Sequence, residues 1–251
     1  MSTIISVHSF RGGTGKSNTT ANLSALLAMD GARVGVVDTD IQSPGIHVLF
    51  GIDENEMGKT MNDFLWGKCT IEEAAHDVTG QVGGDIKGQI FLIPSSIKAG
   101  EIARILREGY DVGLLNDGFR DIVEKLKLDY LLIDTHPGLN EETLLSIAIS
   151  NVLIIILRPD SQDYQGTAVT VDVAKKLDVP KLLMLVNKVP TQFDVEDVRR
   201  RVEQTYNAKV GAVLQHSDEM MTLASSGIFS IRFPDSPMTK GLRALADQLK
   251  P

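Results

Sequence analysis

The sequence has almost no cysteine, since Cys69 is the only one among its 251 residues. One cysteine excludes a disulfide within the chain and a paired-cysteine zinc site. It also cannot supply the thiolates that hold an iron–sulfur cluster within one chain. This cysteine content fits the reducing cytoplasm, where we expect the protein to reside.

Long hydrophobic runs are missing as well. The longest, at 152–157, is far shorter than the ~20 residues that a membrane-spanning helix needs. The N-terminus lacks the basic start and the small-residue cleavage site of a signal peptide. We therefore expect a soluble protein that is neither exported nor integral to a membrane.

The chain has no excess of positive charge. Lys and Arg number 25 against 33 for Asp and Glu, a net charge of −8, which argues against coating nucleic acid by bulk electrostatics. A local basic patch stays open, because 199–201 is a run of arginines in a segment where Val195, Val198 and Val202 recur at helical spacing. These arginines either contact DNA or form a solvated face balanced by acidic neighbours.

The order of apolar segments predicts the fold. A hydrophobic fraction of 43% can fill a core, and we expect one domain over residues 1–251. Short apolar or β-branched runs, each followed by helical periodicity, occur at 4–8, 33–38, 90–94, 130–134, 152–157 and 181–186. This alternation predicts an α/β fold with a mostly parallel central sheet and helices on both faces.

Residues 51–88 are the least regular part of the sequence and include the only tryptophan, Trp66. The segment is either an insertion that faces a partner or a pair of short helices that packs Phe64, Leu65 and Trp66 into the core.

A glycine-rich loop follows the first expected strand and precedes the first expected helix. It reads Phe-Arg-Gly-Gly-Thr-Gly-Lys-Ser over 10–17. Glycines let backbone N–H groups converge on phosphate oxygens, where the helix N-terminus adds its positive dipole. Lys16 would reach the β- and γ-phosphates, and the Ser17 hydroxyl would bind magnesium. Phe10 departs from the P-loop pattern G-x-x-x-x-G-K-[ST], which has glycine there. The predicted nucleotide-binding residues of this loop are Arg11, Gly12, Gly13, Thr14, Gly15, Lys16, Ser17 and Asn18.

Carboxylates end two of the expected strands. Asp38 and Asp40 close the 33–38 strand, and Asp134 closes the 130–134 strand as in a Walker B motif. The carboxyl ends of parallel strands are where open α/β folds bind ligands. A magnesium site and an attacking water explain these carboxylates better than helix capping does. The turn at 135–138 could then sense the γ-phosphate.

These motifs, in their order and spacing, resemble the ParA/MinD family of deviant-Walker-A (SIMIBI) P-loop ATPases. The likeness continues at 186–188, at 213–217 and in the last helix, 241–249. It implies ATP/ADP and Mg²⁺ as cofactors, Asn187 at the adenine, and Gln215 and His216 in a loop that walls the base. It also implies Ser17, Asp38 and Asp134 around magnesium, and Asp40, Lys16 and Arg11 as the catalytic residues, with Asp40 orienting the water.

One position departs from the family, which has a signature lysine where this chain has Arg11. The resemblance implies that this residue reaches across a nucleotide-sandwich homodimer to the partner's phosphates. Arginine keeps the charge but differs in donor geometry. Alternatively, Arg11 only pairs with a local carboxylate such as Asp134 or Asp160.

We expect the segments 43–47 and 135–140 to change with the nucleotide. His136 could serve as a general base, line this switch or contact the partner subunit; the role given to Asp40 favours the last two. His8 and His47 lack ligand-like spacing and are expected to be structural.

Three cellular roles follow. The first is a ParA-like ATP switch that positions a cargo with a stimulating adaptor and binds DNA nonspecifically, which would associate it with the nucleoid. The second is a MinD-like regulator; because the chain stops at 249–251 without a basic amphipathic extension, it would reach membranes through a partner and not directly. The third is a metabolic enzyme or cluster carrier, for which the sequence offers neither a second-substrate cluster nor paired cysteines.

Overall fold

The computed structural model describes residues 2–250, and a single eight-stranded sheet runs through this range. The strands are β1 Thr3–His8, β2 Arg33–Asp38, β3 His76–Asp77, β4 Gln89–Ile93, β5 Tyr130–Asp134, β6 Val152–Leu157, β7 Lys181–Val189 and β8 Lys209–Gln215. They lie in the order β3-β4-β2-β5-β1-β6-β7-β8. Every pair is parallel except β3 with β4. The predicted mostly parallel sheet is confirmed.

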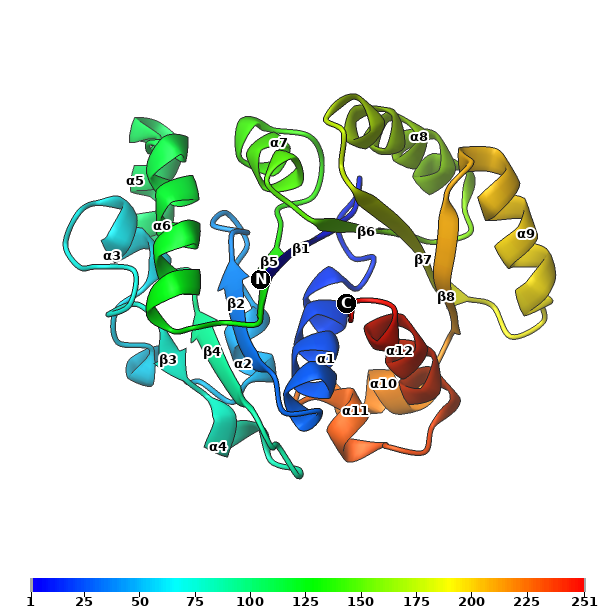
Figure 1. Ribbon diagram of the computed structural model, residues 1–251, viewed down its shortest axis with the longest axis horizontal. Coiled ribbons are helices and arrows are strands. Elements are labelled where there is room, and N and C mark those ends of the chain that lie inside the picture. Colours follow the sequence, from blue (N-terminus) through cyan, green and yellow to red (C-terminus); the bar gives the residue numbers. More distant parts are fainter. Residues whose placement is uncertain (1, 251) are drawn as a thin grey trace.

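Helices cover both faces of this sheet, as predicted (Figure 1). The longer ones are α1 Lys16–Met29, α5 Ala99–Glu108, α6 Val112–Lys125, α7 Glu141–Ala148, α8 Ser161–Lys176, α9 Val195–Tyr206 and α12 Pro237–Asp247. The shorter ones are α2 Ile46–Leu49, α3 Met61–Leu65, α4 Thr79–Val82, α10 Asp218–Leu223, α11 Phe229–Arg232 and the 3-10 turn η1 Glu54–Glu56. Helices α1, α11 and α12 lie on one face, and α6 to α9 lie on the other. No helix within residues 2–250 is long and apolar enough to cross a membrane.

All six predicted strands form, but the sequence pattern missed β3 and β8. The resemblance placed 213–217 in a loop; the structure corrects this, because β8 continues to Gln215. Lys209 begins β8, and Gly211 interrupts its short apolar run, which hides its strand character. A side chain at Gly211 would be 2.5 Å from the Leu245 side chain, so the glycine lets α12 pack closely on the strand.

The irregular segment at 51–88 folds onto the main sheet. It contains η1, α3, β3 and α4. Leu65 is buried, and Phe64 and Trp66 pack against the hydrophobic cluster between the sheet and α6. This arrangement supports the second alternative for the segment, in which short helices pack these side chains into the core, over an insertion that faces a partner.

Helix α1 is buried on nearly all sides, which fixes the end that carries the phosphate loop. It lies between the sheet and the layer of α11 and α12. The buried Asn22 accepts a hydrogen bond from the backbone N–H of Ser230, at 2.7 Å, and so ties α1 to α11. The N-terminus of α1 is thereby held at the carboxyl edge of β1.

Candidate functional site

The glycine loop connects β1 directly to α1 and has the backbone shape of an anion cradle. Gly13 and Gly15 have φ angles of 73° and 102°, in the region that favours glycine. Gly15 is the N-cap of α1, and no side chain caps the helix there. The first N–H groups of α1 are therefore available to a phosphate, in the field of a 14-residue helix.

Most of the residues predicted to bind phosphate, together with Asp40, line one pocket of about 350 Å³, whereas Arg11 and Thr14 are not part of its lining. Its lining brings the loop together with the ends of β2 and β5 and comprises Gly12, Gly13, Gly15, Lys16, Ser17, Asn18, Asp40, Ser43, His136, Pro137 and Lys188. Lys16 is only 7% exposed, so its ammonium group is held inside the site. The three segments predicted to form a phosphate site thus converge in space.

Two buried carboxylates lie side by side behind this pocket. Asp38 and Asp134 are register partners on β2 and β5, with 0% and 1% exposure. Burial raises the pKa of Asp134 to about 6, against the opposing effects of Ser17 and Lys16. Burial and the neighbouring Asp134 raise the pKa of Asp38 well above its usual value. Such a pair of carboxylates is stabilised by a cation between them.

Asp40 lies nearer the surface and lines the pocket itself. Its backbone N–H donates to Asp38 Oδ1 at 3.0 Å. Its own Oδ1 lies 2.6 Å from Nδ1 of His136, in the turn after β5. His136 therefore contacts Asp40 within the same chain.

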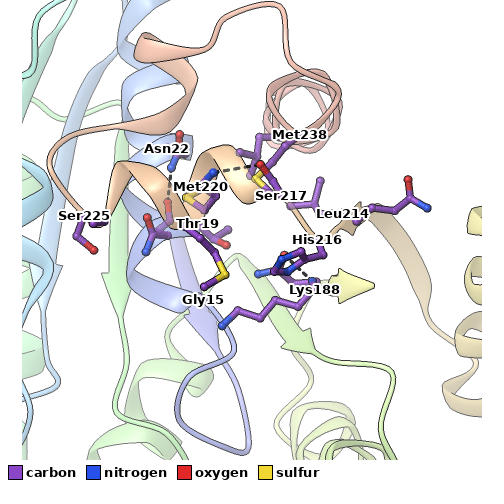
Figure 2. A pocket seen from close by; sticks show the side chains of 16 residues that line it. Gly15, Thr19, Asn22, Lys188, Leu214, His216, Ser217, Met220, Ser225 and Met238 are labelled. Carbon is purple, nitrogen blue, oxygen red and sulfur yellow. Dashed lines mark hydrogen bonds between the residues drawn. The ribbon is translucent and has the colours of Figure 1, made fainter. Parts of the chain in front are cut away.

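A second pocket of about 330 Å³ adjoins the first and shares Gly15, Asn18 and Lys188 with it. Figure 2 shows side chains from α1, the end of β8, α10 and α12 around this space. The wall from α10 and α12 is apolar and includes Met220, Met221 and Met238. A flat apolar base beside a phosphate loop fits a pocket of this kind.

Asn187 and Lys188, at the end of β7, join the second pocket to the phosphate loop. The Asn187 amide donates to the Thr14 carbonyl at 2.8 Å, and the Lys188 ammonium donates to the Gly13 carbonyl at 2.8 Å. An asparagine amide has a second N–H and spare acceptor capacity, so Asn187 can also contact a base. The backbone of Lys188 has φ 55°, at an irregularity in the β7–β8 pairing.

Gln215 and His216 line the same pocket at the end of β8. The Gln215 amide donates to the carbonyls of Thr191 and Phe193, at 3.3 and 3.4 Å. The backbone N–H of His216 donates to the Val189 carbonyl at 2.8 Å. Contacts with the end of β7 and with the loop after it thus hold this segment at the pocket.

Arg11 points to the N-terminus of α8. Its Nη1 lies 3.4 Å from Oδ1 of Asp163 and 3.7 Å from Oδ1 of Asp160. The sequence suggested Asp134 or Asp160 as a local partner of Arg11. The structure shows Asp160, together with Asp163, which the sequence analysis did not predict. Phe10 is accommodated on the same helix, because its ring lies over Gly166, where a Cβ would come within 1.9 Å.

Sequence reasoning missed several residues of the site. Lys188, the methionines of α10 and α12, Asp163 and the contact between His136 and Asp40 carried no motif that assigned them. Asn22 was also missed, although the predicted Asn18 gave a local signal for it, because residues four apart share one helix face. The Asn22 amide donates to the Asn18 carbonyl at 2.7 Å.

The arginines at 199–201 do not form a free basic face. Arg199 donates to the Val210 carbonyl at 2.5 Å, Arg200 pairs with Asp197, and the Arg201 guanidinium lies 5.4 Å from the Tyr164 ring centroid. Local partners therefore engage all three, which favours the balanced solvated face predicted as the alternative to DNA contact.

The residues present fit a nucleotide with magnesium. The loop supplies N–H donors and Lys16 for phosphates, while Ser17, Asp38 and Asp134 supply oxygen ligands. Within residues 2–250 no three His, Cys, Asp or Glu side chains gather in a way that could hold a metal by themselves. Mg²⁺ needs no such cage, since it binds through few carboxylates together with phosphates and water. Fold and site together define a P-loop nucleotide-binding protein.

Comparisons with known proteins agree with this class. A family model described as AAA domain matches residues 2–182. An ATP-binding protein of Methanocaldococcus jannaschii is 27% identical over 250 residues, covering 99% of this chain and 88% of the relative. An iron–sulfur cluster carrier protein of Pyrococcus horikoshii is 28% identical over 192 residues, covering 73% and 60%. The solved structure of MinD with Mg-ADP from Pyrococcus horikoshii superposes with a TM-score of 0.80 at 22% identity, covering 100% and 96%.

The chain belongs to the family that the AAA-domain model describes. It is a P-loop ATPase of the ParA/MinD type.

Proposed function

We propose that the protein is a magnesium-dependent ATP switch that forms a nucleotide-sandwich homodimer and positions a cellular cargo with a stimulating adaptor. The observation that carries the proposal is the convergence of the glycine loop and Asp40 at one pocket, next to strand ends that carry the paired carboxylates Asp38 and Asp134. The chemistry is attack of water on the γ-phosphate, which needs no covalent intermediate.

Each residue has a role that its position supports. The loop N–H groups and Lys16 bind the β- and γ-phosphates, and Asp40 orients the attacking water. Ser17, Asp38 and Asp134 hold Mg²⁺, which offsets phosphate charge. Asn187, Gln215 and His216 surround the adenine, together with the methionines of α10 and α12.

A second copy would complete the phosphate site. Gly12 and Gly13 are exposed in this chain, and Arg11 is 39% exposed at the edge of the loop. A partner subunit that covers them would exclude water from the phosphates. Arg11 would then leave Asp160 and Asp163 and contact the partner's nucleotide.

A cluster-carrier function has one observation in its favour, the likeness to iron–sulfur cluster carriers. However, Cys69 is the only cysteine, and a homodimer would contain only two thiols. We therefore favour the switch.

The test is the solution mass of Asp40→Ala with magnesium and ATP or ADP. We expect ATP to bind, to remain unhydrolysed and to produce a dimer that ADP does not produce. Lys16→Ala is the control and should stay monomeric with either nucleotide. A persistent Asp40→Ala monomer would contradict the sandwich dimer, and loss of ATP binding would contradict the role of Asp40.

The cargo is addressed with the same trapped dimer. Binding to unrelated duplex DNA across a salt series would support DNA-based positioning if affinity falls steeply with salt. Binding to vesicles with anionic lipids would support a membrane role instead. A dimer that binds neither directs the search to a protein partner.

A further inference from the structure

The contact between His136 and Asp40 joins an imidazole nitrogen to a carboxylate oxygen. Nδ1 of His136 lies 2.6 Å from Oδ1 of Asp40. An ionised carboxylate can only accept a hydrogen bond, so Nδ1 carries the hydrogen in this contact. The imidazole therefore acts on Asp40 as a donor, and not as a base that could receive a proton at Nδ1.

This donor occupies one defined oxygen of the carboxylate. The backbone N–H of Ser43 donates to the same Oδ1 at 3.2 Å. Within residues 2–250 both hydrogen bonds to the Asp40 side chain thus end on Oδ1. Oδ2 is left for the pocket, which Asp40 lines together with Lys16 and Ser17.

The backbone that carries the imidazole is restricted. Pro137 follows it, and the residue before a proline has a restricted backbone. Behind the turn lies Glu142, in the first turn of α7, which accepts a hydrogen bond from the Tyr110 hydroxyl.

We propose that His136 is a positioning residue for ATP hydrolysis, which fixes Oδ1 of Asp40 so that Oδ2 is directed at the attacking water. This inference rests on the proposed role of Asp40. Catalysis of phosphoryl transfer depends mainly on positioning, and a displacement of about 1 Å can lower the rate on the order of 100-fold. The effect should therefore appear in kcat and not in nucleotide binding.

Two variants of similar size separate the hydrogen bond from the shape of the side chain. His136→Asn keeps an N–H at the position of Nδ1, two bonds from Cβ, whereas His136→Leu has a methyl group there. We expect His136→Leu to lower kcat about 10- to 100-fold. The kcat of His136→Asn should remain within about threefold of that of the parent protein. Both variants should bind Mg-ATP with nearly unchanged affinity. Equal losses in the two variants, no loss in His136→Leu, or a change confined to affinity would each overturn the proposal.

A double variant tests whether His136 acts through Asp40. In the Asp40→Ala background, His136→Leu should not lower the residual rate of ATP hydrolysis any further, because its target is gone. A further loss as large as that of the single variant would show that His136 acts independently and would refute the proposal. If His136→Leu fails to fold, as judged by urea unfolding, His136→Gln replaces it. The glutamine amide lies one bond further from Cβ and therefore does not place an N–H at the position of Nδ1.

The series also separates this inference from the proposed function. If the parent protein hydrolyses ATP and Asp40→Ala does so equally fast, the assigned role of Asp40 fails. If Asp40→Ala is inactive but His136→Leu is fully active, only the inference about His136 fails.

Discussion

Arg11 and Asp163 are joined across the structure, with Nη1 of the arginine 3.4 Å from Oδ1 of the aspartate. Asp163 is only 2% exposed, and its Oδ2 also accepts hydrogen bonds from the backbone N–H and Nε of Arg158, at 3.0 and 3.1 Å. One buried carboxylate therefore links the phosphate loop to the start of α8.

Removing this carboxylate should be costly to the fold. Asp163→Ala leaves the Arg158 N–H and two guanidinium groups without their acceptor, so we expect the free energy of unfolding to fall by about 2–3 kcal/mol. Asp160→Ala is the control: Asp160 is 43% exposed and caps α8, which predicts a loss of about 1 kcal/mol. Urea unfolding of the nucleotide-free proteins measures both, and equal losses would contradict the account.

The two positive-φ glycines of the loop should differ in their tolerance of a side chain. Gly13→Ala meets no atom within 4 Å and should cost about 1–2 kcal/mol of stability through φ alone. Gly15→Ala is also strained by its φ of 102°, and its Cβ would lie 2.5 Å from Nδ2 of Asn187. We expect Gly15→Ala to cost at least about 1 kcal/mol more, because the amide must leave the Thr14 carbonyl. Urea unfolding without nucleotide gives this difference, and a Gly13→Ala loss of the same size would refute it.

The buried His8 should make stability depend on pH. Burial, followed by the charges of Lys16 and His136, lowers its pKa from 6.5 to about 3. Between these values the unfolded chain binds a proton that the folded chain does not, so stability falls as the pH drops. The contribution is complete above about pH 6.5 and decreases by about 1.4 kcal/mol per pH unit toward pH 3.

His8→Asn removes this titration, although it also loses the contact with Thr135 and will lower stability at all pH values. We therefore compare slopes of unfolding free energy between pH 6.5 and 4.5. The parent protein should lose about 2–3 kcal/mol more than the variant over this range. Parallel curves would show that His8 is not the titrating group.

Lys188 should contribute to nucleotide affinity through the phosphate loop. Lys188→Met removes the hydrogen bond to the Gly13 carbonyl and a positive charge from both pockets. We expect ATP affinity to fall about 5- to 10-fold, equivalent to about 1–1.4 kcal/mol. Lys181→Met, at the other end of β7, loses a hydrogen bond to the Gln248 carbonyl and should leave affinity unchanged. Calorimetric titration measures both, and an equal effect of the two would contradict this role.

The sequence by itself determined the architecture and the core of the phosphate site. Alternating apolar runs and helical periodicity are local properties, so six strands were predicted and formed. The glycine loop and Asp38, Asp40 and Asp134 stand at the ends of strands, and parallel strands bring such ends to one edge of the sheet. Their convergence follows from topology alone.

Only the tertiary structure decided which groups meet across that edge. Asn187 contacts Thr14 from 173 residues away, and His136 contacts Asp40 from 96 residues away. The pairing of Arg11 with Asp163 and the packing of β8 under α12 are of the same kind. A local pattern specifies which face a side chain takes, but the partner on that face depends on strand order and helix packing, which fix distances between segments that the sequence keeps far apart.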